Sequence, residues 1–113
     1  MNILHKEEGT KVELAEECTV LEYHLNDKDI NVAVADINGR YPLEGRIVNE
    51  VCKEIGYIIE GEGIIVIEDQ EIKLKKGSAV LINSGERYYW EGKMKMLISC
   101  TPEWYPEQHR DVE

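Results

Sequence analysis

The chain has 113 residues, 42% of them hydrophobic, and a net charge of −10 at neutral pH. This length predicts one domain, spanning residues 1–113, with a core that folds without disulfides. The negative charge argues against nucleic acid and anionic membranes as partners, because both would repel the protein.

No secretory or membrane-spanning segment is predicted. The first residues, MNILHKEEGT, lack the apolar stretch of a signal peptide. The longest apolar runs, IIVI and AVLI, are far shorter than the roughly 20 residues of a transmembrane helix. Cys18, Cys52 and Cys100 are odd in number and form no CxxC pair, which favours reduced thiols. We therefore expect a cytoplasmic protein.

Short apolar segments separated by Gly, Asn and Asp run along most of the chain, a spacing that predicts an all-β sandwich or barrel. Alternation in MKMLIS is expected to place Met94, Met96 and Ile98 on one buried face. In the tail, Thr101 and Pro102 are predicted to begin a short helical turn. The expected strands are CTVLEYHL, INVAVADI, YIIEG, GIIVIED, EIKLKKG, SAVLINSG, RYYWEG and MKMLISC.

Two segments carry a family resemblance, residues 45–63 and residues 77–90. In the first, Glu54 is followed after six residues by Gly61, within an EGEG turn. In the second, SAVLINSG is followed by Tyr88. Together they resemble the two conserved motifs of the cupins. The resemblance implies a double-stranded β-helix, which is a small jelly-roll barrel, and makes a homodimer the expected assembly.

The resemblance does not extend to the metal ligands of the family. The two histidines of the first motif fall on Val48 and Glu50, or on Ile47 and Asn49, depending on the gap that is chosen, and the histidine of the second motif falls on Tyr88. Only Glu54 is retained, and one carboxylate is too weak a ligand set for a first-row metal. No cofactor is therefore expected.

One alternative metal site stays open. If the strand pleat is regular, Glu50, Cys52 and Glu54 share a face, and thiolate and carboxylate are both acceptable zinc ligands. A divalent metal bound by these three residues is the alternative to a metal-free barrel.

Glu54 and Tyr88 are the candidate catalytic residues. A carboxylate inside a barrel needs a partner, and the Tyr88 phenol is placed to donate to it across the former metal position. That contact has two interpretations: it satisfies both groups structurally, or Glu54 is a general base with Tyr88 as acid or orienting group. The candidate ligand-binding residues are Arg46, Asn49, Cys52 and Trp90.

The favoured functional hypothesis is a barrel that binds a small polar metabolite, sugar-like or amino-acid-like, without a metal. The first rival is an isomerase or lyase that uses Glu54 and Tyr88. The second is a metal-dependent enzyme with the unusual ligands named above. A third is a dimerisation unit whose pocket is filled by Tyr88 and Trp90.

Overall fold

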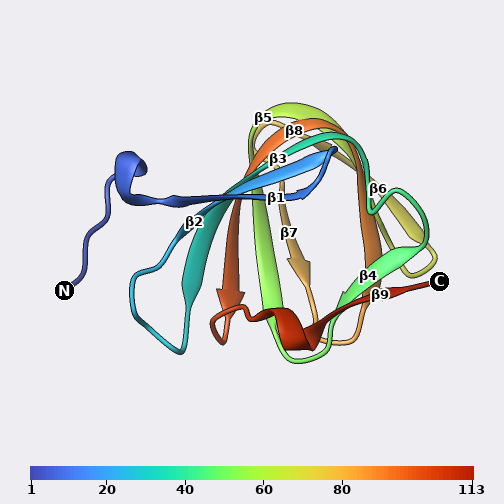
Figure 1. The fold of residues 1–113 in the computed structure, drawn as a ribbon. Coiled ribbons are helices and arrows are strands. Elements are labelled where there is room, and N and C mark those ends of the chain that lie inside the picture. The colour runs from blue at the N-terminus through green and yellow to red at the C-terminus, as the bar shows by residue number, and fades with distance from the viewer.

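The computed structural model describes all of residues 1–113 and is almost entirely β-structure. Nine strands belong to one continuous sheet that curls into a barrel (Figure 1). The predicted all-β jelly-roll fold is confirmed. The strands are β1 (Thr10–Ala15), β2 (Cys18–Tyr23), β3 (Asn31–Tyr41), β4 (Arg46–Asn49), β5 (Lys53–Ile67), β6 (Gln70–Lys75), β7 (Ala79–Ile82), β8 (Arg87–Thr101) and β9 (His109–Val112), with 3₁₀ turns η1 (Lys6–Glu8) and η2 (Pro106–Gln108).

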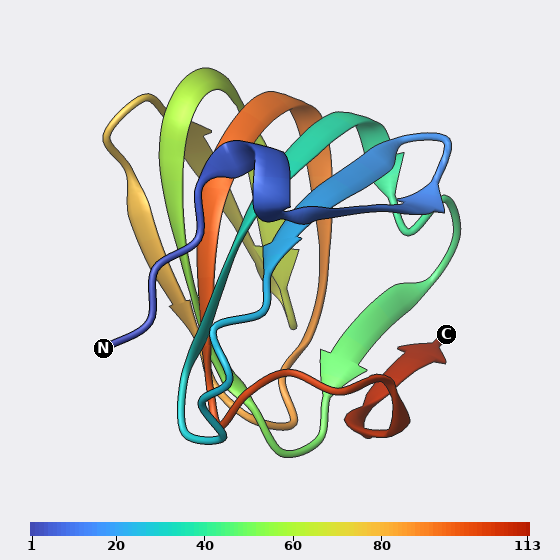
Figure 2. The same ribbon diagram turned by 60° about the vertical axis from the view of Figure 1, so that its left-hand side comes forward.

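The two longest strands, β5 and β8, form the spine of the barrel. They pair antiparallel along their whole length. On its other edge β8 pairs with β4 and then β3, while β5 pairs with β7 and then β6. Both strands arch over one end of the molecule (Figure 2). The two halves of each strand therefore belong to different walls of the barrel.

A row of glycines allows this arch. Gly92 of β8 lies opposite Gly39 of β3 on one side and Gly63 of β5 on the other. The φ angles of Gly92 and Gly39 are 141° and 114°, values that side chains disfavour. The prediction that EGEG and Gly92 end strands is wrong. Each of β5 and β8 joins two predicted strands, because glycine bends the chain here without interrupting the pairing.

Alternation along the strands separates the core from the surface. Met94 and Met96 of β8 are buried, and Ile98 packs against the same core, as predicted. On β5, Glu54 and Ile58 point inward by the same alternation. The inward-facing carboxyl of Glu54 is thus a consequence of strand register.

The C-terminal segment closes the other end of the barrel. After β8 the chain crosses below the strands and turns at η2, and β9 then pairs antiparallel with β4 (Figures 1 and 2). The predicted helical turn at Thr101 and Pro102 is misplaced, since the 3₁₀ turn begins at Pro106. Asn49 lies opposite His109 in the β4–β9 register, which brings the tail to the position of the cupin-like site.

The outer face of the sheet carries exposed apolar side chains. Ile55 and Tyr57 of β5 lie beside Leu81 of β7 and Leu97 of β8. Two copies of the chain could pack through this apolar surface. The homodimer stays a prediction. No helix in the chain is both long and apolar enough to cross a membrane.

The glycine row predicts a large loss of stability for Gly92→Ala. A Cβ on Gly92 would lie 2.5 Å from the Cα of Gly63, at a φ that already disfavours a side chain. Backbone strain and overpacking together predict a loss of about 3 kcal/mol in the free energy of unfolding, measured in urea.

Gly77→Ala is the matched control. Gly77 also has a positive φ, but a Cβ there meets nothing within 4 Å. Only the strain remains, and the expected loss is about 1 kcal/mol. Equal losses in the two variants would show that the close approach of β5 and β8 does not require glycine.

Candidate functional site

A cavity of about 90 Å³ lies inside the barrel, between β1–β3, the inner faces of β5 and β8, and the C-terminal segment. Of its 18 lining residues, 14 are hydrophobic. The other four are Glu22, Asn31, Glu54 and His109. A ligand would meet an apolar wall with a few polar groups, the usual composition of a small-molecule site.

Glu54 supplies the one deeply buried carboxyl of this lining. It is only 7% exposed, and strand pairing sets it between Ile82 of β7 and Cys100 of β8. Asn49 Nδ2 donates to Glu54 Oε1 at 3.2 Å, and the Tyr88 hydroxyl and the Cys100 thiol approach the same oxygen at 3.5 and 3.7 Å. Oε2 has no hydrogen-bond partner within the chain. One oxygen is held by the protein and the other is left for a partner from outside.

The environment of Glu54 changes its acidity. Burial raises the pKa of Glu54 from 4.5 to about 7, and the donors Asn49, Cys100 and Tyr88 only partly oppose this shift. Desolvation therefore exceeds hydrogen bonding. Glu54 exchanges its proton near neutral pH, where a general acid or base is most effective.

Gln108 determines how the polar network is oriented. Its Oε1 accepts hydrogen bonds from the backbone N–H groups of Val51 and Cys52, at 3.1 and 3.0 Å. Backbone N–H groups are always donors, so this atom must be the amide oxygen. Gln108 Nε2 is then the donor to Asn49, at 2.9 Å. The Asn49 atom that it contacts is therefore the oxygen, Oδ1.

The orientation of Asn49 fixes the proton on His109. Nδ1 of His109 lies 2.8 Å from the same Oδ1 of Asn49, so Nδ1 carries the hydrogen. In the neutral ring Nε2 is then an acceptor. On its other side, Asn49 Nδ2 donates to Glu54 and to the Tyr88 hydroxyl, each at 3.2 Å. One asparagine thus links the histidine of the tail to the buried carboxyl.

Tyr88 and Trp90 share the inner face of β8. Both are buried, both line the cavity, and their rings meet edge to face with centroids 6.0 Å apart. Burial and the nearby Glu54 raise the pKa of Tyr88 well above its usual value. Tyr88 therefore remains a neutral phenol that is able to donate a hydrogen bond.

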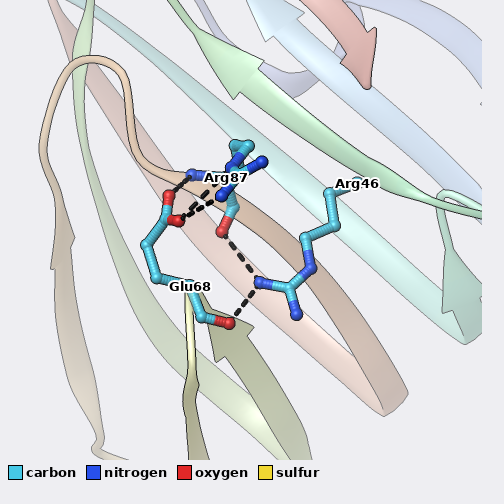
Figure 3. Close-up of polar contacts among 3 residues, drawn as sticks. All are labelled: Arg46, Glu68 and Arg87. Carbon is cyan, nitrogen blue, oxygen red and sulfur yellow. Dashed lines mark hydrogen bonds and ion pairs between the residues drawn. The ribbon is translucent and has the colours of Figure 1, made fainter. Parts of the chain in front are cut away.

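Arg46 lies outside the cavity, so its predicted contact with a ligand in the barrel is not supported by its position. Figure 3 shows its guanidinium donating to the backbone carbonyls of Glu68 and Arg87. Arg87 in turn pairs with the Glu68 carboxylate at 3.0 Å. Arg46 is on an outer wall, where it joins the β5–β6 turn to the start of β8.

Cys52 and Asn49 are buried behind the cavity. The Cys52 thiol donates to the carbonyl of Pro102 at 3.3 Å and does not line the cavity. Asn49 also lies outside the lining and acts through Glu54, Tyr88 and His109. Of the four predicted ligand-binding residues, only Trp90 faces the cavity directly.

Glu50, Cys52 and Glu54 do not lie together as the alternative metal site requires. No three His, Cys, Asp or Glu side chains are arranged to hold a metal. Glu50 is exposed and pairs with Arg110, while Cys52 faces the tail. The regular pleat on which that prediction depended ends at Asn49, where β4 stops, and β5 begins only at Lys53.

The usual cupin metal does not fit the donors present either. At the expected ligand positions stand an amide and a phenol beside Glu54, and the Asn49 amide directs its N–H groups at the carboxyl. A cation at that place would face positive hydrogen atoms rather than lone pairs.

Sequence reasoning missed several residues of the site. The sequence indicates no role for Gln108 and His109, and Tyr41, Cys100 and Trp104 also line the cavity. The available signal was the polar pair Gln108–His109 in a tail that also carries the large aromatic residues Trp104 and Tyr105. No motif spacing connects this tail to Glu54.

Comparison with known proteins supports the fold. Residues 41–99 match the family model for the cupin domain. No functionally curated protein matches the sequence.

Similar solved structures have varied activities. Pac13, a nucleoside dehydratase from Streptomyces solved with uridine, superposes with a TM-score of 0.87 at 15% identity, over 96% of this chain and 88% of its own. Ectoine synthase from P. lautus gives 0.77 at 18% identity, over 100% and 91%. The polyketide cyclase RemF from Streptomyces resistomycificus gives 0.75 at 17%, over 100% and 86%. At these identities the similarity establishes a shared fold.

The raised pKa of Glu54 predicts a specific pH dependence of stability. Below pH 4.5 the carboxyl is protonated in both folded and unfolded chains, while between pH 4.5 and about 7 the folded chain binds more protons. Stability therefore falls as pH rises through this window, by up to about 3 kcal/mol. Glu54→Gln removes this term and keeps an oxygen for Asn49. The difference in unfolding free energy between variant and wild type should grow from pH 5 to pH 8, and parallel curves would contradict the shift.

Gln108→Ala should destabilise the protein strongly. It leaves the buried N–H group of Cys52 without an acceptor, at a cost of about 1–3 kcal/mol, and also removes the acceptor of the partly buried Val51 N–H group. Arg110→Ala, in the same segment, removes only an exposed pair with Glu50 and should cost less than about 1 kcal/mol. Urea unfolding of both variants measures the difference, and similar losses would contradict the role of Gln108.

Proposed function

The chain belongs to the cupin family, and on that premise we propose that its cavity binds a small organic molecule with which Glu54 exchanges a proton. The reaction class is a metal-independent lyase or isomerase step. Glu54 is the general acid or base, and Tyr88 orients the reacting group.

One observation carries this proposal: a buried carboxyl with one free oxygen in a mostly apolar cavity. Oε1 of Glu54 is held by Asn49, while Oε2 has no partner within the chain. A pKa of about 7 makes both protonation states accessible at neutral pH. Oε2 is not one of the fully buried atoms without a partner, so it keeps accessible surface from which a ligand is able to reach it.

The neighbouring phenol supports the assignment. Tyr88 accepts a hydrogen bond from Asn49 and retains its own proton, which lies within reach of Glu54 Oε1 or of a ligand. Its raised pKa makes it a donor rather than a base. Glu54 is therefore the group that changes protonation state, and Tyr88 is the group that orients.

Binding without chemistry is the second candidate. The cavity lining of 14 hydrophobic residues among 18 favours a molecule with apolar surface over a fully hydroxylated sugar. A dimerisation unit without a ligand would be expected to have a filled barrel. The cavity beside Tyr88 and Trp90 therefore argues for a binding function. The dehydratase and the cyclase among the similar structures are precedents for enzymes on this fold.

The test starts from ligands found by thermal shift against a metabolite library. Each ligand is incubated with the protein in D₂O containing EDTA, and solvent deuterium incorporation or loss of water is followed by proton NMR. Wild type is expected to catalyse exchange or elimination in EDTA. Glu54→Gln is expected to bind but to lose at least about a hundredfold in rate, the usual contribution of a general base.

Glu50→Gln is the matched control, because Glu50 is exposed and pairs with Arg110 outside the cavity. It should react at the wild-type rate. Full activity in Glu54→Gln would remove Glu54 as the proton-transfer group. Binding without any exchange or elimination would favour the metabolite-binding function.

A further inference from the structure

We propose that Nε2 of His109 is a ligand contact that accepts a hydrogen bond from a hydroxyl or N–H group, so that the cavity takes an uncharged or cationic donor molecule rather than an anion. This inference rests on the proposed function and names the substrate class of the same cavity. It assigns a role to the C-terminal segment, which lies outside both cupin-like motifs.

The first argument is an unpaired atom. Nε2 of His109 has almost no accessible surface and no hydrogen-bond partner within the chain, whereas the free Oε2 of Glu54 keeps accessible surface. His109 is also one of the residues that line the cavity. A buried polar atom without a partner costs about 1–3 kcal/mol relative to a satisfied one. A ligand that donates a hydrogen bond to Nε2 removes that cost. Such a ligand should therefore bind more tightly than one without a donor.

The second argument is that this atom cannot become a donor by a tautomer change. Nδ1 must donate to Asn49, because Asn49 Oδ1 also receives Gln108 Nε2. The ring is held in place as well, since Trp104 packs against it with centroids 5.4 Å apart. Burial lowers the pKa of His109, which keeps the ring neutral and leaves the Nε2 lone pair available.

The third argument is the sign of the charges in the lining. Glu22 and Glu54 are the only acidic residues there, and no lysine or arginine lines the cavity. The Arg46 guanidinium donates hydrogen bonds to backbone carbonyls on an outer wall. A carboxylate or phosphate would enter an apolar space without a counter-ion, which is strongly unfavourable.

A series of small rings tests the inference. Cyclopentanol supplies a donor, cyclopentanone only an acceptor, cyclopentylamine a cationic donor and cyclopentanecarboxylate an anion. Trp90 and Trp104 are the two tryptophans of the chain and both line the cavity, so their indole N–H signals in NMR titrations report binding. Wild type should bind the alcohol about three- to tenfold more tightly than the ketone, as expected for one neutral hydrogen bond. The amine should bind, and the carboxylate should move neither signal.

His109→Asn is the discriminating variant. Its amide can still donate to Asn49 in place of Nδ1, but it has no atom in place of Nε2. The alcohol and the ketone should then bind equally, with the ketone affinity unchanged. The matched control is His5→Asn, at an exposed histidine outside the cavity, which should keep the preference for the alcohol. In the wild type, the ¹⁵N resonance of Nε2 should shift on addition of the alcohol and not on addition of the ketone.

The outcomes separate the two proposals. If His109→Asn keeps the preference for the alcohol, or if the carboxylate binds as tightly as the alcohol, the role of His109 is overturned while a binding cavity stands. If no member of the series moves either tryptophan signal, the cavity does not bind small organic molecules, and the proposed function fails together with this inference.

Discussion

Two backbone N–H groups, those of Val51 and Cys52, set the chemistry of the whole site. They lie between β4 and β5, where the chain leaves one strand before it enters the next, and they need an acceptor. The Gln108 side chain from the tail is that acceptor. Because its oxygen is used there, its nitrogen must face Asn49, and the orientation of the Asn49 amide and the tautomer of His109 then follow. Local backbone hydrogen bonding thus decides which atoms remain free for a ligand.

The Glu54 carboxyl, in contrast to the rest of this network, has fewer hydrogen bonds than it is able to accept. Glu54 keeps a single good donor, Asn49 at 3.2 Å, and two longer contacts from Tyr88 and Cys100. Three short donors would hold the carboxyl ionised at neutral pH, whereas no donor would keep it protonated well above that range. The observed balance leaves the pKa at about 7. Proton exchange with a ligand requires a pKa near neutral pH, whereas a carboxyl with only a structural role does not require one.

The sequence predicted the fold and some of the residues that line the cavity, for reasons that differ between the elements. Strand alternation and motif spacing identified Glu54, Tyr88 and Trp90, because all three lie on long regular strands. Cys52 was misplaced because the chain turns between β4 and β5, which breaks the alternation. His109 was missed because its position depends on the β4–β9 pairing between residues 60 apart in the chain. Neither strand periodicity nor a short motif predicts a contact between residues so far apart in the sequence.

The replacement of the metal ligands changes what Glu54 is able to do. In a metal site, a cation beside the carboxylate stabilises the ionised form and keeps its pKa low. Here the Asn49 amide occupies a ligand position and offers one neutral N–H bond, which compensates for only part of the desolvation. With Asn49 in place of a metal-binding histidine, the pKa of Glu54 therefore lies near neutral pH. The neutral His109 ring, reached through the same asparagine, supplies an acceptor without adding a positive charge that would lower the Glu54 pKa. In this barrel a neutral amide, rather than a cation, lies beside the Glu54 carboxyl, and that is the physical basis of its raised pKa.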